Sequence, residues 1–292
     1  MTDRLEVPKT YKLFIGGAFP RSESGRSIPV TNAKGKVLAH ISHASRKDLR
    51  DAVEAARKAQ PKWADATAYN RGQVLYRMAE MLEGKKAEFI GLIGGAAGKK
   101  EAEAAIDRLV CFGGWADKYA QVLGCNNPVA GPFYNFTVPE PTGVVGVMAP
   151  DEPGLLGLVS LIAPPLCAGN AVIALAGELH PLIGAVFGEV CATSDIPAGV
   201  VNILTGRREE LVPQFASHRD IDAIHAAGLS PDQAKAVREG TADNLKRVFI
   251  HQGSGQRRDA GAIDWFDDDR CQSPWLIEPF VEMKTMWHPS GA

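Results

Sequence analysis

The spacing of hydrophobic residues along the chain predicts two regions of different architecture. Residues 11–40 alternate apolar and polar positions between glycine turns, a pattern that predicts short β-strands. From residue 45 onward the apolar spacing becomes helical. Ser45 stands three residues before Asp48 in a capping-box arrangement, so we expect a helix to begin there and to end at Pro61.

Two more helices are predicted before residue 126. One of them carries methionine and leucine side chains on a single face, which we interpret as core rather than as a cofactor contact: Leu75, Met78, Met81 and Leu82. The other helix is expected from about residue 99 to residue 123.

After residue 126 the pattern changes to short apolar segments that alternate with apolar stretches of helical length. Strands are predicted at 143–148, 171–175, 199–204 and 221–225. Such βαβ units form an open parallel sheet with right-handed crossovers, and ligands bind beyond the carboxyl ends of its strands. The expected fold class is therefore α/β.

The run from Gly154 to Leu175 has no charge and is long enough to cross about 30 Å of hydrocarbon. Pro164 and Pro165 are expected to break a helix in the middle of that run. We therefore predict a buried helix at 155–163 followed by a buried strand, and no membrane partner.

The regular pattern stops after Val248. Residues 251–274 are polar and are predicted to be irregular, whereas residues 275–292 look extended. A terminal strand with exposed apolar groups needs a partner edge, which is often another subunit. The residues expected to make that contact are Phe280, Glu282, Lys284 and Trp287.

The composition of the chain indicates which kinds of partner and which cellular compartment to expect. The 292 residues are 45% hydrophobic and 23% charged, which is typical of a globular protein. The 32 basic residues nearly balance the 34 acidic ones, so we expect no nucleic-acid partner. The first residues mix both charges without the apolar core of a secretion signal, and the five cysteines form no CxxC pair; both features predict a cytoplasmic protein.

The junction after the 143–148 strand carries Asp151 and Glu152. Amides at the start of a helix attract a phosphate or an oxyanion, but two carboxylates there would repel an anionic ligand. We expect them to cap the helix amides themselves. No GxGxxG or GxxxxGK[ST] pattern accompanies these strands.

No nucleophile or metal site stands out. Cys167 is expected to be inert core, and Cys111 and Cys191 lie on helical segments. Cys271 is expected to be better exposed, with the preceding aspartates 267–269 raising the pKa of its thiol. The pair His40 and His43 lacks further ligands, so no metal and no catalytic residue are predicted.

Several motifs in order resemble the aldehyde dehydrogenase superfamily over about residues 11–250 and again at the extreme C-terminus. They are IGGAF with SGR (15–26), EPTGVVGVMAP (140–150), APPLCAGNAV (163–172), IPAGVVNILTG (196–206) and NLKRV (244–248). The resemblance implies a Rossmann-like cofactor domain over residues 1–250, preceded within it by the β-rich and helical segments described above.

The resemblance also implies where the chemistry of active relatives has been lost. Their oxyanion-hole Asn and the adjacent Trp are replaced by Asp151 and Glu152, and an ionised carboxylate cannot donate a hydrogen bond. Of the Lys-Pro-Ser-Glu-like motif that contacts the adenosine ribose only Glu178 remains, and Gly228 remains from the turn near the phosphates. Glu178 and Gly228 are the candidate cofactor-binding residues. We expect no cofactor, with weak NAD(P) binding as the alternative.

Active relatives follow the AsnLeuLysArg motif with a Glu-Leu-Gly-Gly base motif and a catalytic domain that bears the nucleophilic Cys. Here the sequence is HisGlnGlySer at 251–254, and the tail resembles the family's oligomerisation strand. The resemblance therefore implies that the catalytic domain is missing: residues 251–274 form a linker and 275–292 an oligomerisation tail. This layout is similar to the noncatalytic C-terminal half of family-16 aldehyde dehydrogenases.

The resulting hypothesis is a noncatalytic aldehyde dehydrogenase-like subunit, structural or regulatory, that assembles with itself or with an active aldehyde dehydrogenase. The alternative is an NAD(P)-dependent aldehyde oxidoreductase with an unrecognised Cys, or a nucleotide-binding regulator.

Overall fold

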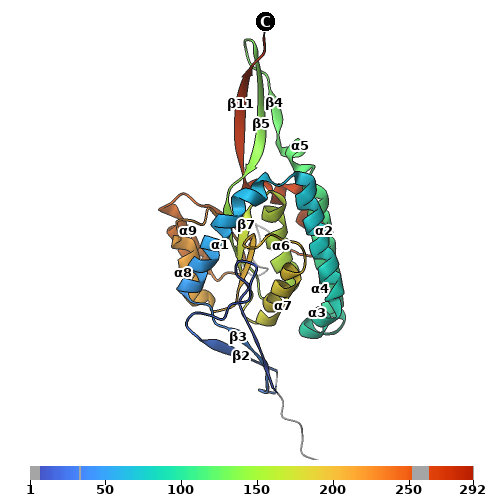
Figure 1. Cartoon of the computed structure of the whole chain (residues 1–292), viewed down its shortest axis with the longest axis vertical. Helices are drawn as coiled ribbons and strands as arrows, with labels where there is room; N and C mark the ends of the chain where they lie inside the picture. Colours follow the sequence, from blue (N-terminus) through green and yellow to red (C-terminus); the bar gives the residue numbers. More distant parts are fainter. Residues whose placement is uncertain (1–6, 33, 252–262, 292) are drawn as a thin grey trace, which may run out of the picture.

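A computed structural model describes residues 7–32, 34–251 and 263–291 of the chain (Figure 1). The N-terminal sheet has the strand order β1-β3-β2 and pairs β1 (Lys9–Tyr11) and β2 (Ser27–Thr31) on either side of β3 (Val37–Ser42). The β-rich start of the chain is thus confirmed. Five helices follow: α1 (Arg46–Asp65), α2 (Ala68–Gly84), α3 (Lys86–Ile93), α4 (Gly95–Trp115) and α5 (Tyr119–Leu123).

The predicted capping box at the start of α1 is present. The Ser45 side chain accepts from the amide of Asp48, and the Asp48 carboxylate accepts from the amide of Ser45 at 2.7 Å. The predicted end at Pro61 is wrong, because α1 continues to Asp65. Trp63 is buried, and its indole N–H donates to the carbonyl of Leu166 at 3.1 Å. Pro61 has no N–H and so cannot donate a helical hydrogen bond. The contact of Trp63 with Leu166 holds the last turn of α1 in place despite this loss.

The central sheet contains five parallel strands in the order β10-β9-β6-β7-β8. Its elements are β6 (Val144–Met148), α6 (Gly154–Cys167), β7 (Ala171–Leu175), α7 (Pro181–Ala192), β8 (Val201–Leu204), α8 (Arg208–Ser217), β9 (Ala223–Ala227), α9 (Pro231–Ala242) and β10 (Arg247–His251). The four predicted strands are found, and β10 is a fifth that the pattern did not reveal. In Figure 1, α1, α8 and α9 lie on one side of the sheet, and α2, α4, α6 and α7 lie on the other. The α/β fold class is confirmed.

Helix α6 does not end before its two prolines, so the predicted bounds of 155–163 are wrong. It runs through Pro164 and Pro165 to Cys167. Pro165 has no N–H to give to the carbonyl of Leu161, four residues earlier. The ring of His225 on β9 lies 2.8 Å from that carbonyl and takes the missing donor's place. Within the described residues, no helix is long and apolar enough to cross a bilayer.

A third sheet forms an arm that projects from the body, with the C-terminus near its tip (Figure 1). Its strand order is β11-β5-β4, all antiparallel, from β4 (Cys125–Asn127), β5 (Phe133–Pro141) and β11 (Val281–Pro289). The extended tail predicted from the sequence is β11.

Only residues 252–280 lie between β10 and β11, so there is no catalytic domain at this position in the chain. The described part includes α10 (Asp268–Cys271) and the short 3₁₀ helices η1 (Pro274–Leu276) and η2 (Glu278–Phe280). Trp265, Cys271 and Phe280 are buried against the body. Residues 252–262, which open the predicted linker, lie outside the described residues, and the domain boundaries stay a prediction.

Candidate functional site at the carboxyl edge of the parallel sheet

The loops that follow four neighbouring strands meet at one edge of the central sheet. Sheet order changes direction between β6 and β9, and in open α/β sheets this is where ligands bind. In this chain the side chain of Arg208, from the first turn of α8, lies across that edge. Its exposed fraction is only 7%.

Arg208 bonds to groups that follow β6 and β9. The guanidinium Nη1 lies 3.0 Å from Asp151 Oδ2 and donates to the carbonyl of Gly228 at 3.2 Å. Nη2 donates to the carbonyl of Ala149. A buried cation needs such a set of acceptors, because an unpaired charge inside a protein is strongly unfavourable.

The two candidate cofactor-binding residues belong to this same network. Glu178, after β7, accepts from the backbone amide of Arg208 and lies 3.3 Å from the guanidinium of Arg207. Gly228 has a φ of +65°, a conformation that favours glycine, and its carbonyl accepts from Arg208. The structure thus brings Glu178 and Gly228 together around Arg208. Arg208 itself was not among the residues predicted from the sequence. Their role in cofactor binding stays a prediction.

The expected capping of α6 by its own acidic residues is wrong. Asp151 Oδ1 accepts instead from the amides of Glu178 at 2.6 Å and Leu179 at 3.1 Å, and the Glu152 side chain is 76% exposed. The turn directs both side chains away from the helix start. Sequence spacing alone could not show this direction.

The amides at the start of α6 are capped from a different helix. Glu101 of α4 is buried, and its Oε1 accepts from the amides of Leu155 at 2.6 Å and Leu156 at 3.2 Å. Burial raises the pKa of the Glu101 carboxyl, and the two backbone hydrogen bonds oppose that shift. A carboxylate therefore already occupies the helix start that could have attracted a phosphate or an oxyanion.

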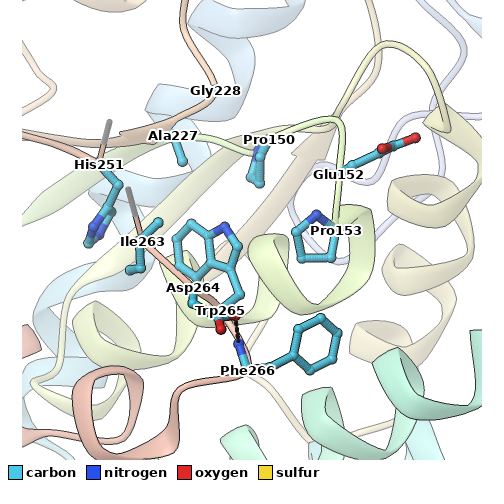
Figure 2. A pocket seen from close by; sticks show the side chains of 10 residues that line it. All are labelled: Pro150, Glu152, Pro153, Ala227, Gly228, His251, Ile263, Asp264, Trp265 and Phe266. Carbon is cyan, nitrogen blue, oxygen red and sulfur yellow. Dashed lines mark hydrogen bonds between the residues drawn. The ribbon is translucent and has the colours of Figure 1, made fainter. Parts of the chain in front are cut away.

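A cavity of about 290 Å³ lies beside this edge, and Figure 2 shows its lining. The ring of Trp265 lies within it, with Pro153 on one side and His251 on the other. Glu152 and Asp264 are the acidic residues of the lining. No thiol is among the described residues that line it.

The cavity is backed by a pair of histidines that the sequence did not reveal. The Nε2 atoms of His225 and His251 lie 3.0 Å apart. Burial lowers the pKa of His225 well below its ordinary value, and burial lowers the pKa of His251 to about 4. Because the Leu161 carbonyl can only accept, Nδ1 of a neutral His225 carries the proton, and His251 donates to the Nε2 of His225.

Three of the five cysteines are buried and so are unsuited to nucleophilic attack. Cys167 and Cys191 are buried as predicted, and burial raises the pKa of both thiols. The expected exposure of Cys271 is wrong: the residue is fully buried at the end of α10, where its Sγ contacts the carbonyl of Asp264 at 3.3 Å. Burial is the main cause of its raised pKa, rather than the neighbouring aspartates.

These contacts do not fit the pyrophosphate of a dinucleotide. Such a group needs free amides at a helix start or an unpaired cation. The α6 amides are taken by Glu101, and the Arg208 guanidinium is taken by Asp151.

The four residues expected to contact another subunit lie in two different settings. Phe280 is buried beneath the arm, where its carbonyl accepts from the Asn170 side chain at 3.0 Å. Glu282 pairs with Arg247 at 2.8 Å, and Lys284 pairs with Glu140 at 2.9 Å. Trp287 is 59% exposed on β11.

Comparisons with known proteins agree with this architecture. A sequence model described as the aldehyde dehydrogenase family matches residues 19–257. Retinal dehydrogenase 2 of Mus musculus is 35% identical over 264 residues, covering 86% of this chain and 50% of that protein. A putative aldehyde dehydrogenase, DhaS, of Bacillus subtilis (strain 168) is 31% identical over 265 residues, covering 87% and 53%.

Solved structures give the same result. The NAD+ complex of an aldehyde dehydrogenase from Bacillus cereus is similar to this chain with a TM-score of 0.79 at 27% identity, covering 84% of this chain and 51% of that one. The chain spans about half the length of the relatives it matches.

Proposed function

Because the chain belongs to the aldehyde dehydrogenase family, we propose that it is a noncatalytic member that assembles through its arm with itself or with an active aldehyde dehydrogenase. Its role in that assembly is structural or regulatory. We also propose a cytoplasmic location, because five free cysteines fit a reducing environment.

The arm carries this proposal. A three-stranded sheet that projects into solvent has no core of its own, and such sheets need a packed face for stability. Large apolar side chains are nevertheless exposed on it: Phe133, Tyr134, Met283, Met286 and Trp287. An exposed apolar patch on an open sheet edge is typical of an interface with another chain.

The chemistry at the sheet edge supports the noncatalytic part. Thiol nucleophiles act as thiolates, and burial keeps Cys167, Cys191 and Cys271 protonated. The start of α6 is capped by a carboxylate instead of being free to stabilise an oxyanion.

Light scattering tests the assembly role. We expect the purified chain, alone or coexpressed with a full-length aldehyde dehydrogenase, to have a mass above that of a monomer. Trp287→Glu should reduce that mass by placing a charge in the interface. Tyr69→Glu, at a 67% exposed position on α2, is the matched control and should not change it. A monomer under both conditions would refute the assembly role.

A separate assay tests the alternative of an oxidoreductase. Steady NADH production from a panel of aldehydes by the purified wild-type chain, lost in Cys271→Ala, would overturn the noncatalytic proposal.

A further inference from the structure

We propose that the contact partner of β11 is β11 of a second copy of this chain, paired antiparallel about a two-fold axis at Thr285. This inference rests on the proposed assembly role and names its partner. It follows from which backbone groups of β11 are free, and from which side chains the pairing would place opposite one another.

Two hydrogen bonds fix the direction of the backbone groups. Thr142 N donates to Phe280 O at 3.1 Å, and Ser290 N donates to Pro132 O at 2.9 Å. Both belong to the same register in which Glu282 lies opposite Glu140. In an antiparallel ladder every second residue pair exchanges both hydrogen bonds, so the even-numbered residues of β11 direct their N–H and C=O groups toward β5.

The odd-numbered residues Met283, Thr285 and Trp287 therefore direct their N–H and C=O groups to the opposite edge. Among the described residues no strand pairs with that edge. A row of free donors and acceptors on an extended strand is a template for pairing with another strand. A second copy presents the same row, as a two-fold interface requires.

An axis at Thr285 pairs β11 over its whole length. Met283 then lies opposite Trp287 of the second copy, and Thr285 lies opposite its own equivalent. All three have both an N–H and a C=O on the free edge, so each donates and accepts across the interface. Pro289, which has no N–H, falls at the end of the ladder, where a missing donor is tolerated.

The side chains are also compatible in this register. Glu282 faces His288 of the second copy, and Lys284 faces Met286, so no like charges lie directly opposite one another. Met283 and Trp287, 44% and 59% exposed in the single chain, cover one another. A thioether against an indole ring is a favourable contact.

Moving the axis by one residue also keeps odd residues opposite odd residues but fits less well. An axis at Lys284 sets Lys284 opposite its own equivalent. An axis at Met286 sets Met283 opposite Pro289, which has no N–H.

Moving the axis by two residues fits less well again. An axis at Met283 sets Trp287 opposite Pro279, which lies in η2 on the body, and leaves the tip of the arm unpaired. An axis at Trp287 leaves Val281 without an opposite residue in the strand. Only the axis at Thr285 uses all of β11.

Cysteine crosslinking tests the register in the full chain, with Cys125, exposed on β4, first changed to Ser. Directly opposite residues in such a pair have Cα atoms about 5.5 Å apart, within the range that a disulfide spans. Under mild oxidation we expect Thr285→Cys to form covalent dimers. Met283→Cys and Trp287→Cys should crosslink only when the two proteins are mixed. Covalent dimers of Met283→Cys alone would overturn the register.

A proline substitution tests the backbone contact. Thr285→Pro removes one N–H from the free edge and should halve the mass of the assembly, whereas Thr285→Val keeps that N–H and should leave the mass unchanged. Circular dichroism of both variants shows whether the fold is retained. If the wild type assembles but Thr285→Pro stays folded and assembled, or if assembly occurs only with an active aldehyde dehydrogenase, the β11 pairing is wrong and the assembly role stands. A wild type that stays monomeric both alone and with the active enzyme refutes both.

Discussion

The imidazole of His225 donates from Nδ1 to the carbonyl of Leu161, 2.8 Å away, and so replaces the hydrogen-bond donor that Pro165 removes from α6. The same contact fixes the neutral form of His225 and makes its Nε2 an acceptor for His251. One side chain thereby connects a helix, two strands and the wall of the cavity.

This connection predicts that the protein loses stability in mild acid. An unfolded histidine takes up a proton near pH 6.5, whereas folded His251 does so only near pH 4, and the pKa of folded His225 also lies well below 6.5. The unfolded state therefore binds more protons in that window. The free energy of unfolding should fall as pH drops from about 6.5 to about 4, by up to about 1.4 kcal/mol per pH unit for each histidine.

Urea denaturation at a series of pH values measures this slope. His251→Gln retains a donor but no longer titrates, so its slope should be shallower than that of the wild type. His288→Gln, on the exposed arm, is the control and should leave the slope unchanged. Equal slopes in the wild type and His251→Gln would contradict the prediction.

Arg208 is predicted to be a major determinant of stability. Arg208→Ala leaves the Asp151 carboxylate without its cation and should cost about 3–5 kcal/mol. Arg207→Ala, the exposed neighbour, should cost about 1 kcal/mol or less. Urea denaturation measures both. Adding Asp151→Asn to Arg208→Ala should recover part of the loss, and a full loss in the double variant would show that the pair is not coupled.

Glu101 is predicted to stabilise α6 from outside that helix. Glu101→Ala leaves the amides of Leu155 and Leu156 buried without an acceptor and should cost about 1–3 kcal/mol. Glu101→Gln keeps an acceptor oxygen and should cost less. Glu103→Ala, on the exposed face of α4, is the matched control, expected at about 0.5 kcal/mol. A thermal or urea melt in which the three variants are equal would refute the cap.

The occupied sheet edge predicts the result of a nucleotide titration. Calorimetry of the wild-type chain with NAD+ or NADP+ should give no binding heat, because the groups that would contact a pyrophosphate already bond to one another. Saturable heat with NAD+ would favour the nucleotide-binding alternative and would show that the Arg208 network opens.

The sequence by itself determined the features that depend on neighbours along the chain. The strands at 143–148 and 171–175 follow from continuous apolar runs, and the Ser45–Asp48 cap follows from a three-residue spacing. The family resemblance indicated the cofactor-domain fold and the missing catalytic domain. These signals are local or ordered along the sequence, so they are readable without coordinates.

Only the tertiary structure decided the features that join distant residues. Helix α6 passes its prolines because His225, on β9, supplies a donor, and its first amides bond to Glu101, on α4. Cys271 is buried because residues 263–280 fold back on the body, and Arg208 links the loops that follow β6, β7, β8 and β9. Burial and hydrogen-bond partners are properties of the packed chain, and no spacing along the sequence encodes them.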